Sequence, residues 1–365
     1  MNCLVLVVAS SLLIPAAHAA QSVTVDQLQQ ALAAQAAQHK KDGDIAHRLA
    51  SMQLTERLSE QTLAPMIADL KPGGKAALAL DLMADLSAFL PLPASELPDR
   101  PAPDKAAQRA MLSGAFDYTV NSRQHLPDFL ATRATRSYDD GVSALPQDGT
   151  MAALHSELHL VDSSTQEVGY QNGAEVAIAR DGTTSREGSG SELWSRGEFG
   201  PDLTTIVVDA SKGQVAWSHW EQSSTGLAGV FRYVVPQAAS TYHLHYCCSR
   251  DTVADKTTPY ESTPGYHGLL TIDPATGAVL RYTLECDLRS SDPVTLTELA
   301  VQYGKVLIGD GSYFCPIRSL AVMRGWHASP TASQNTILLS INEVTFSNYH
   351  RFGTTLRVLP ADSPQ

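Results

Sequence analysis

Residues 242–248 read Tyr-His-Leu-His-Tyr-Cys-Cys, so two histidines and two adjacent cysteines lie in one strand-like segment. Because side chains alternate between the two faces of a strand, His243, His245 and Cys247 would share a face. Imidazole and thiolate groups at this spacing are suitable zinc ligands, whereas in an oxidising compartment the same cysteines would form disulfides. The interpretation therefore depends on where the protein folds.

A second set of metal-ligand residue types lies where apolar and polar residues alternate around Glu157. His155, Glu157 and His159 would lie on one face of a strand there. If that strand neighboured the one with His243 and His245, the four histidines would converge as zinc ligands. The solvent side of a half-buried sheet carries polar residues in the same alternation, and we favour this simpler interpretation. We therefore assign no metal and no other cofactor.

The N-terminus has the pattern of a secretory signal peptide. A broken apolar run over residues 4–15 is followed by Ala17-His18-Ala19, a small-x-small cleavage pattern. The run is too short to span a bilayer, which takes roughly 20 apolar residues, and no other segment is long and apolar enough. We expect residues 1–19 to be removed and the mature protein to be periplasmic or extracellular, without a transmembrane segment.

The acidic composition and the missing motifs exclude several functions. The 26 Lys and Arg residues are outnumbered by 38 Asp and Glu residues, which gives a formal net charge of −12. Without a basic cluster for phosphate binding, nucleic acid is excluded as a partner. The chain has no His-Glu-x-x-His, P-loop, dinucleotide-binding or Gly-x-Ser-x-Gly motif. Glu198, between Gly197 and Phe199, is the acidic residue that stands out, and a turn position explains it more simply. The sequence therefore favours a protein that is not an enzyme.

Helical patterns dominate the first part of the mature chain. Thr24 and Gln27 form a capping box, and Ser59 is a second helix N-cap, followed by apolar residues at helical spacing. Repeated prolines then exclude a regular helix, and Asp104 begins another one. We expect a helical module over residues 20–90, a Pro-rich linker over 91–103, and a domain over 104–365 that combines this helix with strands.

Runs rich in β-branched and aromatic residues recur from about residue 150 onward and are joined by turns such as 273–277 and 309–311. Short connections favour antiparallel pairing, because parallel strands need crossover helices. The sequence thus predicts an α+β fold in which an N-terminal helical module is followed by a large, mainly antiparallel β-sheet. The runs that we expect to be strands are residues 204–209, 214–221, 229–235, 241–248, 266–272, 278–287, 295–308, 312–324, 336–348 and 355–359.

Distinctive short sequence motifs are spread along the mature chain, at residues 46–49, 54–59, 126–129, 131–133, 196–200, 247–248, 265–268, 272–277 and 313–319. Together they resemble a family of uncharacterised exported bacterial proteins that is common among acidobacteria, a resemblance that implies no known activity. The strand rhythm of the C-terminal half and its 272–277 turn are also similar to outer-membrane lipoprotein-sorting proteins and periplasmic regulators of envelope stress. That similarity implies a strongly curved sheet, like an unclosed barrel, with an apolar concave face.

Four of the five cysteines remain after the signal peptide and its Cys3 are removed. In an oxidising compartment they are expected to pair, and adjacent cysteines rarely bond to each other because the ring geometry is strained. We predict a disulfide from Cys315 to Cys247 or Cys248, which belong to phrases shared with the family. Whether Cys286 forms a second bond stays open.

Aromatic residues are concentrated between residues 217 and 246. Trp217 and Trp220 differ by an odd number, so on a regular strand they would lie on opposite faces, one in the core and one able to line a cleft. By analogy with the sorting proteins, we take Trp217, Trp220, Phe231 and Tyr233 as candidate ligand-binding residues.

The leading hypothesis is an exported envelope protein that binds a hydrophobic ligand or an acylated envelope partner, with the N-terminal helices as a lid, spacer or docking module. One alternative is a secreted hydrolase that uses residues such as His155, Glu157 and His159. Another is a structural or sensing protein that docks a second envelope protein by a sheet edge or by the helical module.

Overall fold

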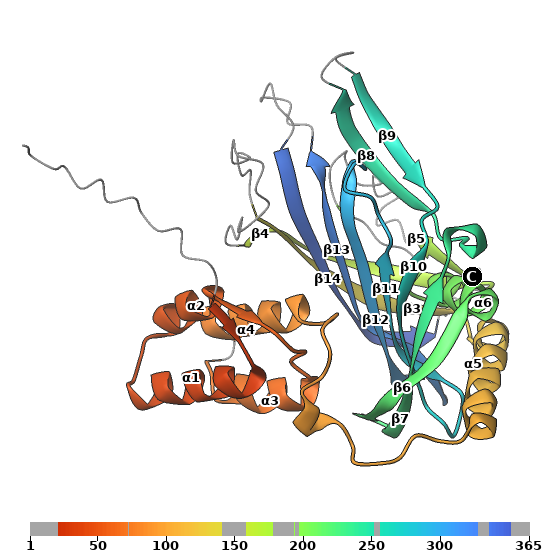
Figure 1. Ribbon diagram of the computed structural model, residues 1–365, viewed down its shortest axis with the longest axis horizontal. Coiled ribbons are helices and arrows are strands. Elements are labelled where there is room, and N and C mark those ends of the chain that lie inside the picture. Colours follow the sequence, from red (N-terminus) through yellow and green to blue (C-terminus); the bar gives the residue numbers. More distant parts are fainter. Residues whose placement is uncertain are drawn as a thin grey trace, which may run out of the picture.

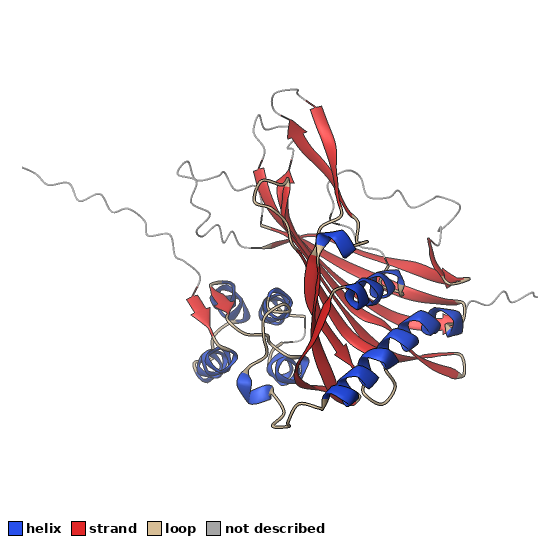
Figure 2. Ribbon diagram, turned by 45° about the vertical axis from the view of Figure 1, so that its right-hand side comes forward, coloured by secondary structure: helices blue, strands red, loops and turns tan. Residues whose placement is uncertain are grey.

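The computed structural model describes residues 21–71, 73–140, 158–177, 193, 197–251, 256–327 and 336–351. The signal peptide expected over residues 1–19 and the strand expected over 355–359 lie outside these ranges. Within them, the α+β prediction is confirmed, because helices accompany a large antiparallel sheet that does not close on itself (Figures 1 and 2).

Residues 21–90 form a helical module with its own hydrophobic core, which contains the fully buried Leu28 and Leu80. The predicted capping box is present. The backbone nitrogen of Gln27 donates to Thr24 Oγ1 over 3.2 Å, and the backbone nitrogen of Thr24 donates to Gln27 Oε1 over 2.9 Å. A short parallel strand pair was not expected from the sequence. The elements are β1 (Gln21–Val23), α1 (Val25–Ala37), α2 (Asp42–Ala50), β2 (Met52–Leu54), α3 (Glu60–Ala68) and α4 (Lys75–Leu86).

The main sheet has ten strands in the order β5-β4-β3-β14-β13-β12-β11-β10-β7-β6, and every pairing is antiparallel. Most neighbours are consecutive in the chain, as a meander requires, but β3 pairs with β14 from the far end of the chain. The strands are β3 (Phe129–Asp139), β4 (His159–Gln171), β5 (Ala174–Ala177), β6 (Gln214–Ser223), β7 (Gly226–Val235), β10 (Tyr266–Ile272), β11 (Val279–Cys286), β12 (Val294–Ile308), β13 (Gly311–His327) and β14 (Thr336–Arg351).

The segment over residues 242–248 leads into a separate two-stranded hairpin, which is made of β8 (Leu244–Asp251) and β9 (Lys256–Ser262). This hairpin extends beyond the main sheet in Figure 1. Leu244 and Tyr246 are buried, whereas His243 and His245 are exposed. The solvated placement expected for the two histidines is therefore confirmed.

Two helices of the second part of the chain lie on one face of the sheet (Figure 2). Asp104 begins α5 (Lys105–His125), as predicted, by accepting a hydrogen bond of 2.8 Å from the Ala107 nitrogen. The strand expected over residues 204–209 is wrong, because this segment belongs to α6 (Pro201–Lys212). Pro201 at the first helical position and apolar residues at helical spacing outweigh the β-branched content of the segment.

Alternate side chains of β13 separate the two faces of the sheet. Ala321 packs into the core beneath α5 and α6, and we call this side the inner face. Leu320 and Val322 point the other way and pack with Leu82 and Phe89 of the helical module, and we call this side the outer face. The sheet therefore lies between α5 and α6 on its inner face and α4 on its outer face.

Candidate functional site

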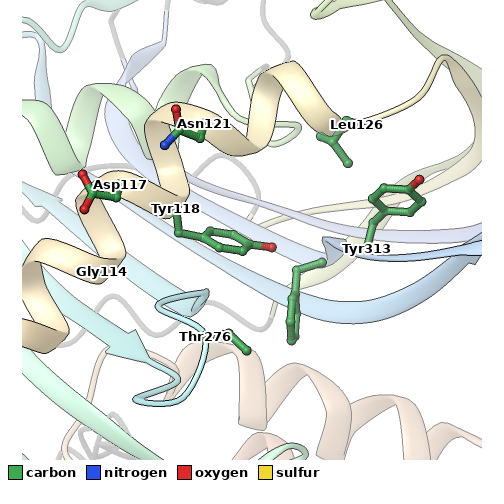
Figure 3. A pocket seen from close by; sticks show the side chains of 8 residues that line it. Gly114, Asp117, Tyr118, Asn121, Leu126, Thr276 and Tyr313 are labelled. Atoms are coloured by element: carbon green, nitrogen blue, oxygen red, sulfur yellow. The ribbon is translucent and has the colours of Figure 1, made fainter.

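A pocket of about 430 Å³ opens between the second half of α5 and the ends of two sheet hairpins (Figure 3). The turn between β10 and β11 supplies Thr276, and the first residues of β13 supply Tyr313 and Phe314. Its volume falls in the range typical of small-molecule sites. The lining residues are Gly114, Asp117, Tyr118, Asn121, Leu126, Thr276, Tyr313 and Phe314.

Three aromatic residues, Tyr118, Tyr313 and Phe314, contribute to the lining of this pocket. The Tyr118 ring lies edge to face against Phe314, with ring centroids 6.5 Å apart and an interplanar angle of 76°. In Figure 3, the Tyr118 ring extends from α5 above the hairpin that carries Thr276, and its hydroxyl points toward the side of the pocket where Tyr313 and Leu126 lie. Burial, together with the nearby Cys315, raises the pKa of Tyr118, so its hydroxyl stays neutral. Such a ring offers a flat apolar surface and a polar end to a ligand.

The depth of the pocket depends on a close approach between α5 and the β10–β11 turn. Gly277 has a φ of +75°, and a Cβ atom there would lie 2.5 Å from the carbonyl oxygen of Gly114. Glycine is required on both grounds, because it adopts positive φ without strain and leaves room for the helix backbone. This contact sets the height of α5 above the sheet.

Among the described residues, the polar groups of the lining include one carboxylate, Asp117, and no lysine, arginine or histidine. Asn121 and Thr276 add an amide and a hydroxyl group, which donate and accept hydrogen bonds. This arrangement suits a neutral or cationic polar group, because an anionic group beside Asp117 would meet like charge, and no described residue of the lining supplies a compensating base.

The candidate ligand-binding residues Trp217, Trp220, Phe231 and Tyr233 lie together on the inner face but do not line this pocket. Phe231 and Tyr233 are fully buried, and Trp220 is 8% exposed. They pack beneath α5 and α6 as part of the main core, and their role in ligand binding stays a prediction.

The expectation that Trp217 and Trp220 lie on opposite faces is wrong. The pairing of β6 with β7 shifts between Trp217 and His219, which marks a β-bulge. A bulge adds one residue on one strand and reverses the alternation beyond it, so both rings reach the inner face.

Glu198 lies in a turn, as expected, but its side chain is completely buried. Its Oε1 atom lies 3.6 Å from Nη2 of the buried Arg133 and 3.3 Å from the Ser319 hydroxyl, which donates to it. Asp202 lies close by, and burial and then the negative charges of Glu198 and Glu175 raise its pKa well above the ordinary value. This cluster joins the Gly197–Gly200 turn to β3 and β13 inside the protein.

The histidines considered as zinc ligands belong to different sheets. His159 is on β4 of the main sheet, whereas His243 directly precedes the β8–β9 hairpin and His245 belongs to it, with Nδ1 of His245 3.3 Å from Glu261 Oε1. His155 and Glu157 lie outside the described residues. The structure therefore does not make neighbours of the two strands on which the metal-site alternative depended.

Cys286 and Cys315 are free thiols in the structure, and Cys315 is buried. The side chains of Cys247 and Cys248 lie outside the described part, so their pairing stays a prediction. The structure gives that pairing no support, since Tyr246, next to Cys247, donates a 2.7 Å hydrogen bond to the carbonyl of Trp326, at the opposite end of β13 from Cys315.

None of the residues that line the pocket was predicted from the sequence as a ligand-binding residue. Asp117 and Tyr118 are adjacent, and Asn121 follows about one turn later, on a helix for which the sequence predicted only the start at Asp104. Thr276 is contributed by a recognised turn, but sequence does not show that α5 crosses this turn. Gly114, in the interior of the helix, was the sequence feature that could have indicated this contact, since an interior glycine often marks a close approach of another backbone segment.

The fold defines an α+β protein with an open antiparallel sheet covered on both faces by helices. No family model and no curated protein matches the chain. Among solved structures, a DUF1329 family protein from Desulfovibrio piger is similar at 10% sequence identity and a TM-score of 0.26, over 67% of this chain and 94% of that chain. A likeness at this TM-score supports no conclusion about fold or function. In the described part of the chain, none of the helices has the length and apolar character of a membrane span.

Proposed function

We propose that the protein is an exported envelope protein that binds a small amphipathic molecule in the pocket beneath α5. The observation that carries the proposal is the pocket of about 430 Å³ itself, with Tyr118, Tyr313, Phe314 and Leu126 as an apolar lining and a few polar groups beside them. Pockets that combine an aromatic surface with a small number of placed polar groups are typical of ligand sites.

The charge of the lining narrows the class of ligand. Asp117 is the carboxylate among the described residues of the lining, and the whole chain carries a net charge of −12. Both favour a neutral or cationic amphiphile over an anionic one such as a free fatty acid. Export is supported by the signal-peptide pattern of residues 1–19.

The test measures binding of the neutral fluorescent probe N-phenylnaphthylamine to the mature protein, followed by competition with a cationic alkylammonium and an anionic fatty acid of equal chain length. Tyr118→Ala removes the central ring, and we expect it to weaken probe binding about tenfold, since loss of a buried aromatic contact costs on the order of 1–2 kcal/mol here. The alkylammonium is expected to displace the probe at a lower concentration than the fatty acid.

Phe116→Ala is the matched control. Phe116 lies on the same helix, is 37% exposed and does not line the pocket. It should leave probe affinity unchanged. Equal binding by wild type and Tyr118→Ala, or equal losses in both variants, would contradict the proposal.

A further inference from the structure

Ionisable side chains from four elements meet where α4 lies on the outer face of the sheet. Arg136 of β3 and Glu343 of β14 are directly opposite each other, and Arg136 Nη2 lies 2.7 Å from Glu343 Oε2. Arg318 of β13 lies 3.0 Å from Glu343 Oε1 and also donates to Asp85 Oδ1 of α4. Asp81, one helical turn before Asp85, interacts electrostatically with both arginines. Tyr138 of β3 is the further titratable group facing this cluster.

The cluster holds one more negative charge than positive charge when all its carboxyl groups are ionised. Three carboxylates, Asp81, Asp85 and Glu343, face the two guanidinium groups of Arg136 and Arg318. Glu343 already contacts both guanidinium groups. The side chains of Asp85 and Glu343 are only 5% and 2% exposed, so water cannot compensate the excess.

The second carboxylate oxygen of Asp85 shows which group carries the uncompensated negative charge. Asp85 Oδ2 is buried and has no hydrogen-bond partner among the described residues. Holding a buried carboxylate without full compensation is costly, and taking up a proton removes that cost. Burial accordingly raises the pKa of Asp85 to about 7, and it raises the pKa of Asp81 as well. The same cause raises the pKa of Tyr138, which therefore stays neutral.

The remaining contacts of the helical module with the sheet do not supply the missing positive charge at this point. Arg57 pairs with Glu221 of β6, and Arg281 of β11 donates to the carbonyl of Ala88. The module has its own core, and it is joined to α5 by a proline-rich segment that holds no α-helix. A module with these properties can separate from the sheet without unfolding.

We propose that docking of the helical module on the outer face of the sheet is coupled to the uptake of one proton by the Asp81–Asp85 pair, so that the module is held more tightly at acidic than at neutral pH. In the undocked module both aspartates face water and titrate at ordinary values. Docking is then strongest when they are already protonated. It weakens as the pH rises toward neutrality, by at most about tenfold in the docking constant per pH unit, and is constant above the pKa of the docked state.

The experiment measures hydrogen exchange of α4 by mass spectrometry on the mature chain between about pH 5 and about pH 8, corrected for intrinsic exchange, with small-angle scattering on the same samples. In the wild type, we expect the protection of α4 to fall and the radius of gyration to rise with pH, while α1 keeps its protection. Asp85→Asn is uncharged at every pH and should keep the module docked throughout. Asp69→Asn, an exposed position on the same module, should behave as wild type.

Asp81→Asn removes the same excess charge from a less buried position, so it tests the idea even if Asp85→Asn folds poorly. A wild type whose α4 protection does not change with pH would overturn the proposal. So would an Asp85→Asn or Asp81→Asn variant with the slope of the wild type. Parallel loss of protection in α1 would also overturn it, because the module would then be unfolding rather than undocking.

Discussion

Trp217 and Trp220 pack edge to face, with ring centroids 4.8 Å apart and an interplanar angle of 69°. The bulge in β6 makes this contact possible by turning both rings to the inner face. Trp220 also reaches back to the segment before α5: its Nε1 atom donates a 2.9 Å hydrogen bond to the carbonyl of Pro101, and Arg100 lies 5.1 Å above its ring. Strand β6 thus contributes side chains to the main core and also binds the segment that precedes α5.

Replacement of Trp220 by alanine should therefore lower the free energy of unfolding by about 3–5 kcal/mol, the usual cost of removing a buried tryptophan. Urea denaturation followed by circular dichroism measures this value. Val234→Ala, at a position that is 40% exposed on the neighbouring strand, should change it by less than about 0.5 kcal/mol. A loss below about 1 kcal/mol for Trp220→Ala would contradict its place in the core.

Gly277→Ala should lower the stability of the protein more than the addition of a single methyl group would suggest. The new Cβ would lie 2.5 Å from the Gly114 carbonyl oxygen at a φ of +75°. We expect a loss of stability of about 2–4 kcal/mol from the unfavourable backbone and the displaced helix together, and weaker probe binding because α5 forms one wall of the pocket.

Gly73→Ala separates these two causes. Gly73 has a φ of +66°, but a Cβ atom there has nothing within 4 Å. It should therefore cost only the backbone component, about 1–2 kcal/mol, and leave binding intact. Equal effects of the two substitutions would show that the contact with α5 is unimportant.

The elements that sequence predicted well are those whose determinants are local. The caps at Thr24, Ser59 and Asp104 satisfy backbone groups a few residues away, and the structure has all three. The short turns that favoured an antiparallel sheet are local in the same sense. The α+β class was therefore available from the sequence alone.

What sequence could not supply depends on contacts between distant segments. The helix at α6 was mistaken for a strand because its β-branched residues were weighed above Pro201 and the helical spacing of Leu203, Ile206 and Ala210. The bulge beside Trp217 leaves no mark in the residue pattern, and it reverses the face of every residue beyond it. The pocket needs α5 to cross a turn about 160 positions later in the chain, which spacing does not reveal.

Glu198→Ala should destabilise the fold by up to about 3–5 kcal/mol, because it removes one of the two carboxylates beside the buried Arg133, which is 4% exposed, and leaves only Glu175 Oε1, at 4.0 Å, among the described carboxylates that pair with it. Thermal and urea unfolding both report the loss. Glu167→Ala, on an exposed position of β4, is the comparison and should be nearly neutral. An unchanged stability for Glu198→Ala would contradict a stabilising role for Glu198 in this buried cluster.

Glu298 makes stability depend on pH. Burial, and then the like negative charge of Glu285 on β11, raise its pKa to about 7. Because the pKa is raised in the folded state, Glu298 makes its full contribution to the free energy of unfolding when the pH is below the ordinary pKa of a glutamate. That contribution is lost as the pH rises toward about 7, by at most about 1.4 kcal/mol per pH unit. Glu298→Gln should therefore be more stable than wild type at about pH 8 and similar to it at about pH 5.

Urea denaturation at the two pH values measures this difference. Glu261→Gln, whose side chain is 77% exposed, should follow the wild type at both. If Glu298→Gln shows no gain at the higher pH, the carboxylate of Glu298 is better solvated or better paired than its surroundings indicate.

Burial raises the pKa of both Cys286 and Cys315 to about 12, so both thiols should react slowly with iodoacetamide in the native protein at about pH 8. After denaturation without reductant, peptide mass spectrometry should find both residues alkylated. Protein recovered from an oxidising compartment gives the decisive comparison. If Cys315 is alkylated there only after reduction, it forms the disulfide predicted from sequence and the free thiol of the structure is wrong.

The pairing of β3 with β14 has a consequence for how the chain reaches its final form. Strands β5, β4 and β3 connect to the rest of the sheet only through β14, whose partners on β3 precede it by about 200 residues. This edge of the sheet cannot join the remainder until the last strand has been made. Contacts of such long sequence separation slow folding, so the chain completes its sheet late, and any truncation before residue 336 divides the sheet in two.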